Sequence, residues 1–225
     1  MKKLIAMLLV MVMVFAMAAC GEKETGMSHE EYMEAAMDAE VTVVTYVQAT
    51  QSWWDNKITA YCQSKDGAYF AYEMACSEED AAKLVPGTKI EITGTKGEWD
   101  GEIEIMDATF KFVEGGDTYI AEALDATALL GTDALIDHQN EKVAFKGLTV
   151  DQITYKNDEP GDDIYVTLTL AGASYNFCVE RYLTGPDSDV YKTVGELKAG
   201  DVVDVEGFLY WYQGANPHIT AITVK

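Results

Sequence analysis

One segment of the chain reads Val85-Pro-Gly-Thr-Lys-Ile-Glu-Ile-Thr-Gly-Thr-Lys-Gly-Glu-Trp-Asp-Gly101, and a second reads Lys198-Ala-Gly-Asp-Val-Val-Asp-Val-Glu-Gly-Phe-Leu-Tyr-Trp-Tyr-Gln-Gly214. Both segments carry three glycines at the same spacing. Between the first and second glycine, apolar and polar residues alternate as they do in a strand, and aromatic residues lie between the second and third. This self-similarity indicates that one structural module occurs twice in the chain.

The first module, residues 28–116, is predicted to contain five strands. They are expected at Val41–Gln48, Lys57–Gln63 and Ala68–Met74, within the first quoted segment, and at Glu102–Phe112. These runs are rich in β-branched and aromatic residues. Ser64-Lys-Asp-Gly67, between the second and third runs, is typical of a hairpin turn. A short helix is expected between the third and fourth strands, because Ser77 followed by three acidic residues is typical of a helix start.

This order of strands, with a helix between the third and the fourth, is that of an OB-fold, a five-stranded Greek-key barrel. We therefore predict a mainly β protein with two tandem OB-fold-like barrels, each with a short helix. Residues 141–225 would form the second barrel. Residues 117–140 would be a partly apolar connector that packs against protein, with a short helix capped by Thr132. A capping box, Ser28-His-Glu-Glu31, predicts another helix before the first strand.

The hairpins of the two modules align without a gap, Asp55–Glu73 against Asp162–Glu180. In the second hairpin the residues predicted to face the core are Ile164, Val166, Leu168 and Leu170. By this alignment the first barrel would enclose Thr59, Tyr61, Phe70 and Tyr72. Its outward face would carry Ile58, Ala60, Cys62, Tyr69 and Ala71. Such a face is too apolar for bare solvent, so the connector, the second barrel or a ligand is expected to cover it.

Residues 1–19 have the pattern of a secretory signal peptide, with Lys2 and Lys3 before an apolar run. The run is shorter than the roughly 20 apolar residues that a transmembrane helix needs. Met17-Ala-Ala-Cys20 resembles the lipobox of bacterial lipoproteins. That resemblance implies that Cys20 is lipidated, by diacylglycerol and palmitate, and that residues 20–27 form a lipidated tether. The alternative is an ordinary secreted protein with a cysteine near its cleavage site.

The composition is strongly acidic. Asp and Glu number 38 against 16 Lys and Arg, which gives a formal net charge of −22. Removal of a signal peptide would take away Lys2 and Lys3 and make the chain more acidic still. Such a charge repels phosphate backbones, so it argues against a nucleic-acid partner.

Motifs that carry catalysis or bind metal are missing from the sequence. The three histidines are scattered and lack zinc-site spacing. Three cysteines besides Cys20 are an odd number, and none forms a Cys-x-x-Cys pair, so neither a disulfide framework nor a metal cluster is expected. The acidic loop Asn157–Asp163 is interpreted as a solvated turn rather than a calcium site. We therefore expect no catalytic residue, metal or cofactor, and a protein that is not an enzyme.

The aromatic residues of two loops in each module are the candidate ligand-binding residues. They are Trp53, Trp54, Trp99, Tyr155, Trp211 and Tyr212. The loops follow the first and fourth strands, and these loops frame the ligand sites of OB-folds. Flat rings stack on sugars or bases or anchor a protein partner. Alternatively, some of the rings plug the barrel ends or pack the modules together; Trp54 is the expected plug if Trp53 faces outward.

The lipobox and the two glycine-spaced segments together resemble the uncharacterised lipoproteins of Gram-positive bacteria that carry tandem OB-fold domains. The resemblance implies a protein anchored by lipid to the cell membrane, on its extracytoplasmic face. The function expected is non-catalytic binding of a glycan or a protein through the aromatic loops. Two alternatives remain: an extracellular OB protein that binds nucleic acid or nucleotides, and a scaffold subunit whose aromatic surfaces are buried in contacts.

Overall fold

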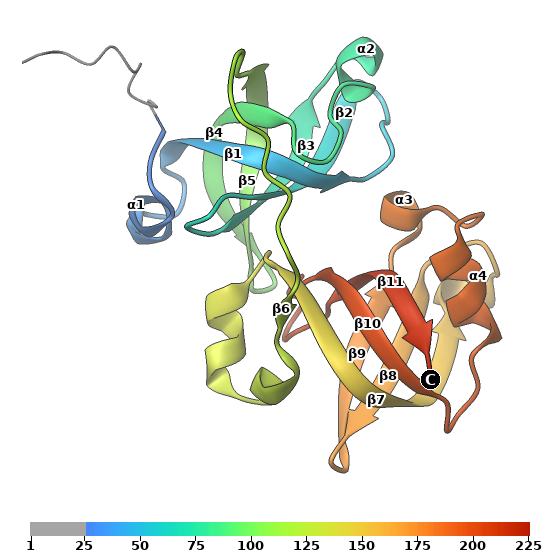
Figure 1. Ribbon diagram of the computed structural model, residues 1–225. Helices are drawn as coiled ribbons and strands as arrows, with labels where there is room; N and C mark the ends of the chain where they lie inside the picture. Colours follow the sequence, from blue (N-terminus) through green and yellow to red (C-terminus); the bar gives the residue numbers. More distant parts are fainter. Residues whose placement is uncertain (1–25) are drawn as a thin grey trace, which may run out of the picture.

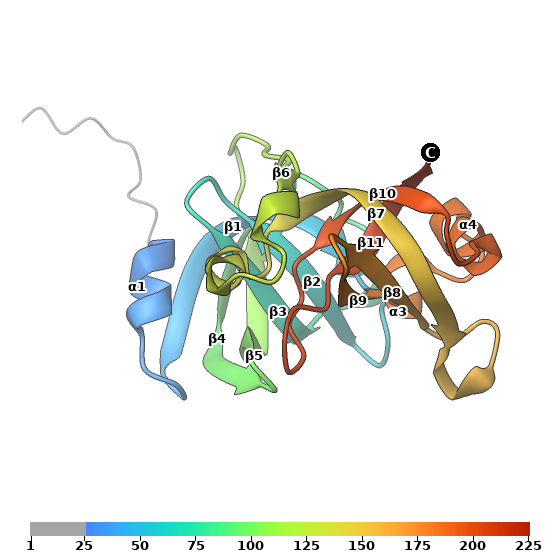
Figure 2. The same cartoon turned by 90° about the horizontal axis from the view of Figure 1, so that it is seen from below.

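The computed structural model describes residues 26–225, and two β-rich modules lie side by side in it (Figures 1 and 2). The predicted signal peptide, the predicted lipidation site Cys20 and most of the predicted tether lie outside the described residues. Across residues 26–225, the helices are too short or too polar to cross a bilayer.

The first module is a closed barrel in the strand order β1-β2-β3-β5-β4. Its strands are β1 (Glu40–Thr50), β2 (Lys57–Gln63), β3 (Ala68–Ala75), β4 (Lys89–Trp99) and β5 (Glu102–Phe112). Helix α1 (His29–Glu34) precedes β1, and α2 (Glu78–Ala81) lies between β3 and β4. The OB-fold-like barrel predicted for this module is confirmed.

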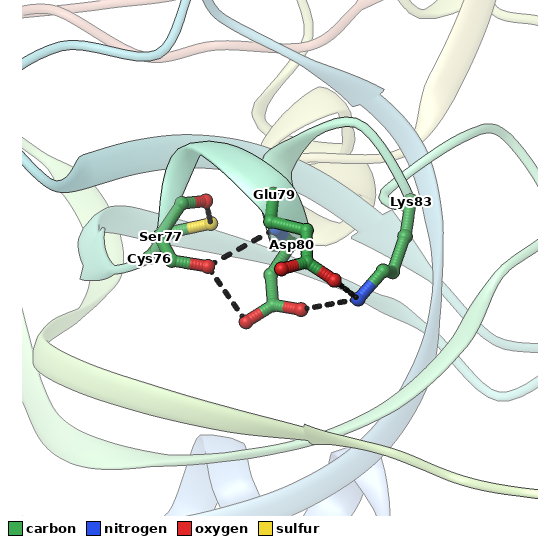
Figure 3. A network of polar contacts seen from close by, with 5 residues as sticks. All are labelled: Cys76, Ser77, Glu79, Asp80 and Lys83. Carbon is green, nitrogen blue, oxygen red and sulfur yellow. Dashed lines mark hydrogen bonds and ion pairs between the residues drawn. The ribbon is translucent and has the colours of Figure 1, made fainter.

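Both of its helices begin at the predicted caps. Ser28 Oγ accepts the amide of Glu31 at 3.2 Å, while the Glu31 carboxylate accepts the amide of Ser28 at 2.8 Å, which completes the capping box. In α2, Ser77 Oγ accepts the amide of Asp80 at 3.1 Å, and Lys83 pairs with the Asp80 carboxylate at 2.9 Å (Figure 3). The caps satisfy amides that have no partner inside the helix.

The predicted faces of the first hairpin are wrong by one residue. The core of the barrel contains the set predicted to face outward: Ile58, Ala60, Cys62, Tyr69 and Ala71. Tyr61 and Phe70 were expected inside, but they pair across β2 and β3 on the opposite face and cluster with Phe208 of the second module. Tyr72 is 42 % exposed, and Thr59 also lies outside the apolar core cluster. The gapless match pairs Ile164 with Lys57, whereas Ile58 is the residue that lies in the first core as Ile164 lies in the second. A one-residue slip of this kind moves every side chain of a strand to the other face.

The second module forms a six-stranded sheet in the order β10-β11-β9-β8-β7-β6, with an additional pairing of β10 and β7. Its strands are β6 (Leu124–Asp125), β7 (Lys142–Tyr155), β8 (Ile164–Leu170), β9 (Ala173–Val179), β10 (Val202–Phe208) and β11 (His218–Val224). This differs from the five-stranded barrel expected. The connector adds β6 parallel to β7, and β11 meets β9 through a single residue pair, His218 with Cys178. The predicted core residues Ile164, Val166 and Leu168 are buried.

The remaining helices of the second half are short. They are the 3₁₀ helices η1 (Thr127–Leu129), η2 (Asp133–His138) and η3 (Lys156–Asp158), and the α-helices α3 (Arg181–Thr184) and α4 (Asp189–Glu196). The connector packs against protein as predicted, because Ala126, Leu130 and Leu135 are buried in the second core. Thr132 stands at the start of η2, but its hydroxyl donates to the carbonyl of Leu129 at 2.8 Å instead of capping the helix.

The two glycine-spaced segments occupy equivalent places in their modules. Gly87 and Gly200 have φ of +90° and +96° in the turns before β4 and β10. Gly94 and Gly207 lie where a neighbouring strand comes close. A Cβ at Gly207 would lie 1.9 Å from the carbonyl oxygen of His218, and one at Gly94 would lie 2.7 Å from that of Met106. The repeat in the sequence is therefore a structural repeat at these positions.

Candidate functional site

A buried aromatic contact joins the two modules. Tyr61 of β2 stacks on Phe208 of β10 with ring centroids 4.5 Å apart, and its hydroxyl bonds to His218 Nδ1 at 2.9 Å. Tyr210 stacks on His218 at 4.4 Å and meets the ring of Phe70 edge-on at 5.4 Å. Burial lowers the pKa of His218 to about 4, so the imidazole is neutral at pH 7. The second module thus covers an outer face of the first barrel, but this face carries Tyr61 and Phe70, which were expected inside. The residues that the second barrel was expected to cover lie in the core instead.

The loop 209–217, between β10 and β11, reaches onto the first module. The amide of Trp211 donates to the Glu102 carboxylate at 2.7 Å, and the amide of Gln213 donates to the carbonyl of Asp100 at 2.7 Å. Trp211 also lies against Gly101, where an added Cβ would come within 2.7 Å of the indole Cδ1. These contacts hold the loop across the boundary between the modules.

Beside this contact lies a cleft of about 830 Å³. Its first wall comes from β3, β5 and the end of β4 in the first module, and its second wall comes from β8, β9 and the loop 209–217. Small-molecule sites in proteins usually have volumes of roughly 300–1,000 Å³ and often lie between domains. The cleft therefore has the size and the place of a ligand site.

Four partly exposed aromatic rings line the cleft, two from each module. They are Tyr72 (42 % exposed), Trp99 (60 %), Tyr165 (45 %) and Tyr212 (49 %). Such rings present flat apolar faces, and the phenol and indole groups add polar edges. The lining is therefore suited to stacking combined with hydrogen bonding.

Carboxyl groups from both modules also line the cleft: Glu104, Asp163 and Glu180. Asp163 is neutralised by Lys156 at 2.9 Å. Glu180 is only 9 % exposed; one of its oxygens accepts the amide of Tyr182 at 3.0 Å, and Oε2 has no hydrogen-bond partner among the described residues. Burial raises the pKa of Glu180 to about 7, and burial also raises the pKa of Glu104. Perturbed groups of this kind gather at functional sites.

Four of the six predicted ligand-binding residues divide into two pairs, one in the cleft and one against the second core. Trp99 and Tyr212, which the two glycine-spaced segments place in related positions, meet in the cleft. Tyr155 and Trp211 instead pack against the core of the second module. For this pair the structure supports packing, which was the alternative interpretation of the aromatic loops.

The other two predicted residues, Trp53 and Trp54, have exchanged the roles expected of them. Trp53 packs against the first core, and its indole Nε1–H donates to the carbonyl of Cys76 at 2.9 Å. Trp54 is 80 % exposed and lies outside the cleft lining. Trp53 is therefore the plug, and Trp54 belongs to neither the core nor the cleft.

Sequence reasoning missed four residues of the cleft. Tyr72 was missed because the misaligned hairpin placed it inside the barrel. Tyr165 alternates with the core residues of β8, so the sequence predicts that it points outward. The sequence does not predict the surface of the first module that faces it. Glu104 and Glu180 are two of many acidic residues, and burial, the property that sets them apart, is not encoded in any local pattern.

Within residues 26–225, no group of three or more His, Cys, Asp or Glu side chains is arranged to hold a metal ion. Cys62, Cys76 and Cys178 are buried and free. Burial raises the pKa of the Cys62 thiol to about 12, so this thiol is unreactive in the folded protein.

Family models and curated proteins give no match to this chain. Among solved structures, the alignment with a murine DNA-binding protein bound to double-stranded DNA covers 81 % of this chain and 94 % of that protein, at 12 % identity and a TM-score of 0.39. The alignment with the p204 HINb domain covers 81 % of this chain and 95 % of that domain, at 12 % identity and a TM-score of 0.37. A third alignment is with asparaginyl-tRNA synthetase from Pyrococcus horikoshii, complexed with asparaginyl-adenylate. It covers 37 % of this chain and 19 % of the synthetase, at 19 % identity and a TM-score of 0.31. At these values the similarities assign neither a family nor a ligand to this chain.

Proposed function

We propose that this protein is a non-catalytic binding protein that holds a glycan in the cleft between its two modules. The observation that carries the proposal is the cleft itself, which is about 830 Å³ in volume and lined by Tyr72, Trp99, Tyr165 and Tyr212. A concave site favours a saccharide-sized ligand over a protein partner, since protein interfaces are typically broad and flatter. Stacked rings bind the apolar faces of sugars, and the amides and carboxyls in the lining can accept and donate hydrogen bonds to hydroxyls.

A glycan array probed with the labelled protein tests this function, with three variants as comparison. Trp99→Ala and Tyr212→Ala should each weaken retention on the array about tenfold or more, because a stacking contact contributes roughly 1–3 kcal/mol. Trp54→Ala is the matched control, since Trp54 is more exposed than Trp99 but lies outside the cleft. If no saccharide is retained, or if retention survives both cleft substitutions, the proposal fails.

Nucleic acid is the second candidate, because OB-folds frequently bind it. Single-strand binders combine aromatic platforms with a positive groove. Here the lining contains the carboxyl groups of Glu104, Asp163 and Glu180 and no Lys or Arg, so the cleft offers no positive groove to a phosphate backbone. We therefore expect no binding to single-stranded DNA or RNA at physiological salt; micromolar affinity that falls steeply with added salt would favour the nucleic-acid function instead.

The proposed location is the extracytoplasmic face of the cell membrane, through a lipid on Cys20. The support for it is the sequence Met17-Ala-Ala-Cys20 behind an apolar run. Replacement of Cys20 by Ser should release the protein into the medium or leave its leader uncleaved. Unchanged membrane fractionation of Cys20→Ser after a high-salt wash would contradict the lipid anchor.

A further inference from the structure

We infer that the ligand of this cleft carries a protonated amine, which pairs with Glu180 and Glu104 while the surrounding rings stack on it. The inference rests on the proposed function, because it assigns a chemical class to the ligand of the same cleft. It depends on three observations: an unpaired buried oxygen, a second buried carboxyl without a partner, and aromatic rings that favour cations.

Glu180 contributes the first observation. Its residue is 9 % exposed, and the Oε2 atom is buried without a hydrogen-bond partner among the described residues, although the side chain lines the cleft. The other oxygen accepts the amide of Tyr182 at 3.0 Å. Buried polar atoms are nearly always satisfied in proteins, so an unpaired carboxylate oxygen that borders a cleft calls for a donor from outside.

Glu104, from the opposite wall, contributes the second observation. It is 5 % exposed, and its carboxyl makes no hydrogen bond or ion pair with any other residue of 26–225. The basic side chains that pair with Asp163 or neighbour Glu180 in the chain are already engaged. Lys156 pairs with Asp163 at 2.9 Å, and the Arg181 guanidinium lies over the Tyr182 ring at 5.1 Å. The cleft therefore presents two acids and no cation to balance them.

The aromatic lining contributes the third observation and separates organic cations from metal ions. The faces of Trp and Tyr rings attract ammonium groups, and carboxylates beside such rings strengthen the attraction. Within the described residues, no cluster of three His, Cys, Asp or Glu donors is arranged for a metal. An amine on a saccharide-sized body would fill the cleft, satisfy Glu180 Oε2 and replace the missing counter-charge.

Isothermal titration with three probes tests the inference. The probes are the disaccharide of β-1,4-linked glucosamine, its N-acetylated counterpart and spermidine. The two sugars share one carbon skeleton and differ in charge, whereas spermidine has the amines without the sugar. We expect the free-amine sugar to bind about 10- to 100-fold more tightly than the acetylated sugar, which is the usual strength of a hydrogen bond to a charged group.

Three variants show whether the preference comes from the cleft. Glu180→Gln and Glu104→Gln keep the shape of the side chain but remove its charge, so each should reduce the preference for the amine about tenfold or more while leaving the affinity for the acetylated sugar unchanged. Glu122→Gln, at an exposed position outside the cleft lining, is the matched control. Titration of spermidine, whose amines are already protonated at pH 7, in buffers of different ionisation enthalpy should also show proton release on binding, because pairing with an ammonium group lowers the pKa of Glu180; Glu180→Gln should lose this release.

Each outcome separates the inference from the proposed function. Equal affinity for the two sugars, or tighter binding of the acetylated sugar, overturns the amine and leaves glycan binding standing. Binding of spermidine alone, lost in Glu180→Gln, supports the amine and overturns the glycan. Absence of binding by all three probes at millimolar concentration overturns the amine, and retention of another saccharide on the glycan array would then leave glycan binding standing. Thermal melts of the variants exclude misfolding as the cause of a loss.

Discussion

The two modules share a strand order and a glycine pattern, but they end in different ways. In the first, Asp100 and Gly101 join β4 to β5 in a tight hairpin, and β5 closes the barrel against β3 through two residue pairs. In the second, the nine residues of the loop 209–217 separate β10 from β11, and one pair joins β11 to β9. The loop 209–217 crosses the boundary between the modules and donates hydrogen bonds to Asp100 and Glu102, at the β4–β5 hairpin of the first module.

This difference shows how a duplicated module becomes asymmetric. The first copy is a closed barrel, and it presents Tyr61 and Phe70 on its outer face. The second copy has Phe208 where the first has Thr95, so it supplies the ring that stacks on Tyr61. The cleft lies between the two copies because each copy supplies only one of its walls.

The largest effect is expected from Phe208→Ala compared with Thr95→Ala, the equivalent position of the first module. Phe208 is 3 % exposed and stacks on Tyr61, so its loss should cost about 3–5 kcal/mol and uncouple the modules into two unfolding transitions. Thr95 is half-buried in β4 and should cost less than about 1 kcal/mol. Calorimetric melts measure both effects. A single unshifted transition in Phe208→Ala would mean that the stack does not couple the modules.

The next effect is pH-dependent and falls on Glu180. Its pKa is raised to about 7 from an ordinary value near 4.5, with Asp163 raising it and Lys156 lowering it besides the burial. The folded state therefore keeps a proton that the unfolded state releases, so the stability contributed by Glu180 is present below pH 4.5 and is lost as the pH rises to 7. Glu180→Gln should be neutral at pH 4.5 and stabilising by up to about 3 kcal/mol at pH 8. Denaturant melts at both values decide this; equal effects at both would contradict the raised pKa.

A smaller loss is expected from the rings that plug the two modules. Trp53→Ala should cost about 2–3 kcal/mol, below the value for a fully buried ring because Trp53 is half-buried, and Tyr155→Ala should cost less. Trp54→Ala, at an 80 % exposed position, should change stability by no more than about 0.5 kcal/mol. Urea melts give all three values. A large loss in Trp54→Ala with none in Trp53→Ala would restore the roles expected from the sequence.

The smallest effect on stability is expected from the cleft rings, Trp99 and Tyr212. They are 60 % and 49 % exposed, so alanine at either position should shift the free energy of unfolding by less than about 0.5 kcal/mol. A loss above about 2 kcal/mol in either variant would show a packing role and would remove that ring from the binding site.

The sequence predicts the repeat well, because glycine spacing depends on close backbone approach that no other residue permits. Gly94 and Gly207 are the clearest case, since an added Cβ at either would collide with a neighbouring strand. The helix starts at Ser28 and Ser77 were predictable for the same local reason, because a cap depends on residues three apart.

Most of the predictions that failed depend on long-range packing. The gapless match between Asp55–Glu73 and Asp162–Glu180 set the two hairpins one residue out of register and so assigned the side chains of β2 to the wrong faces. The alternation within β2 itself, with Ile58, Ala60 and Cys62 on one face, agrees with the observed core. The choice between Trp53 and Trp54 depended on which ring met the core. Glu180 and Glu104 line one cleft although they lie more than 70 residues apart in the chain. Local patterns predict elements, whereas the cleft exists only where distant elements meet.

The three buried native thiols allow local opening of this protein to be measured without engineered labelling sites. A thiol reagent reacts with an exposed thiolate, so the modification rate of a buried cysteine reports how often its surroundings open. Cys62 lies in the first core, Cys76 beside the α2 cap, and Cys178 at the single pair that joins β9 to β11. Mass spectrometry of a time course would separate these three opening rates in one sample. An occupied cleft should slow the reaction of Cys178, which lines it, and leave that of Cys62 unchanged.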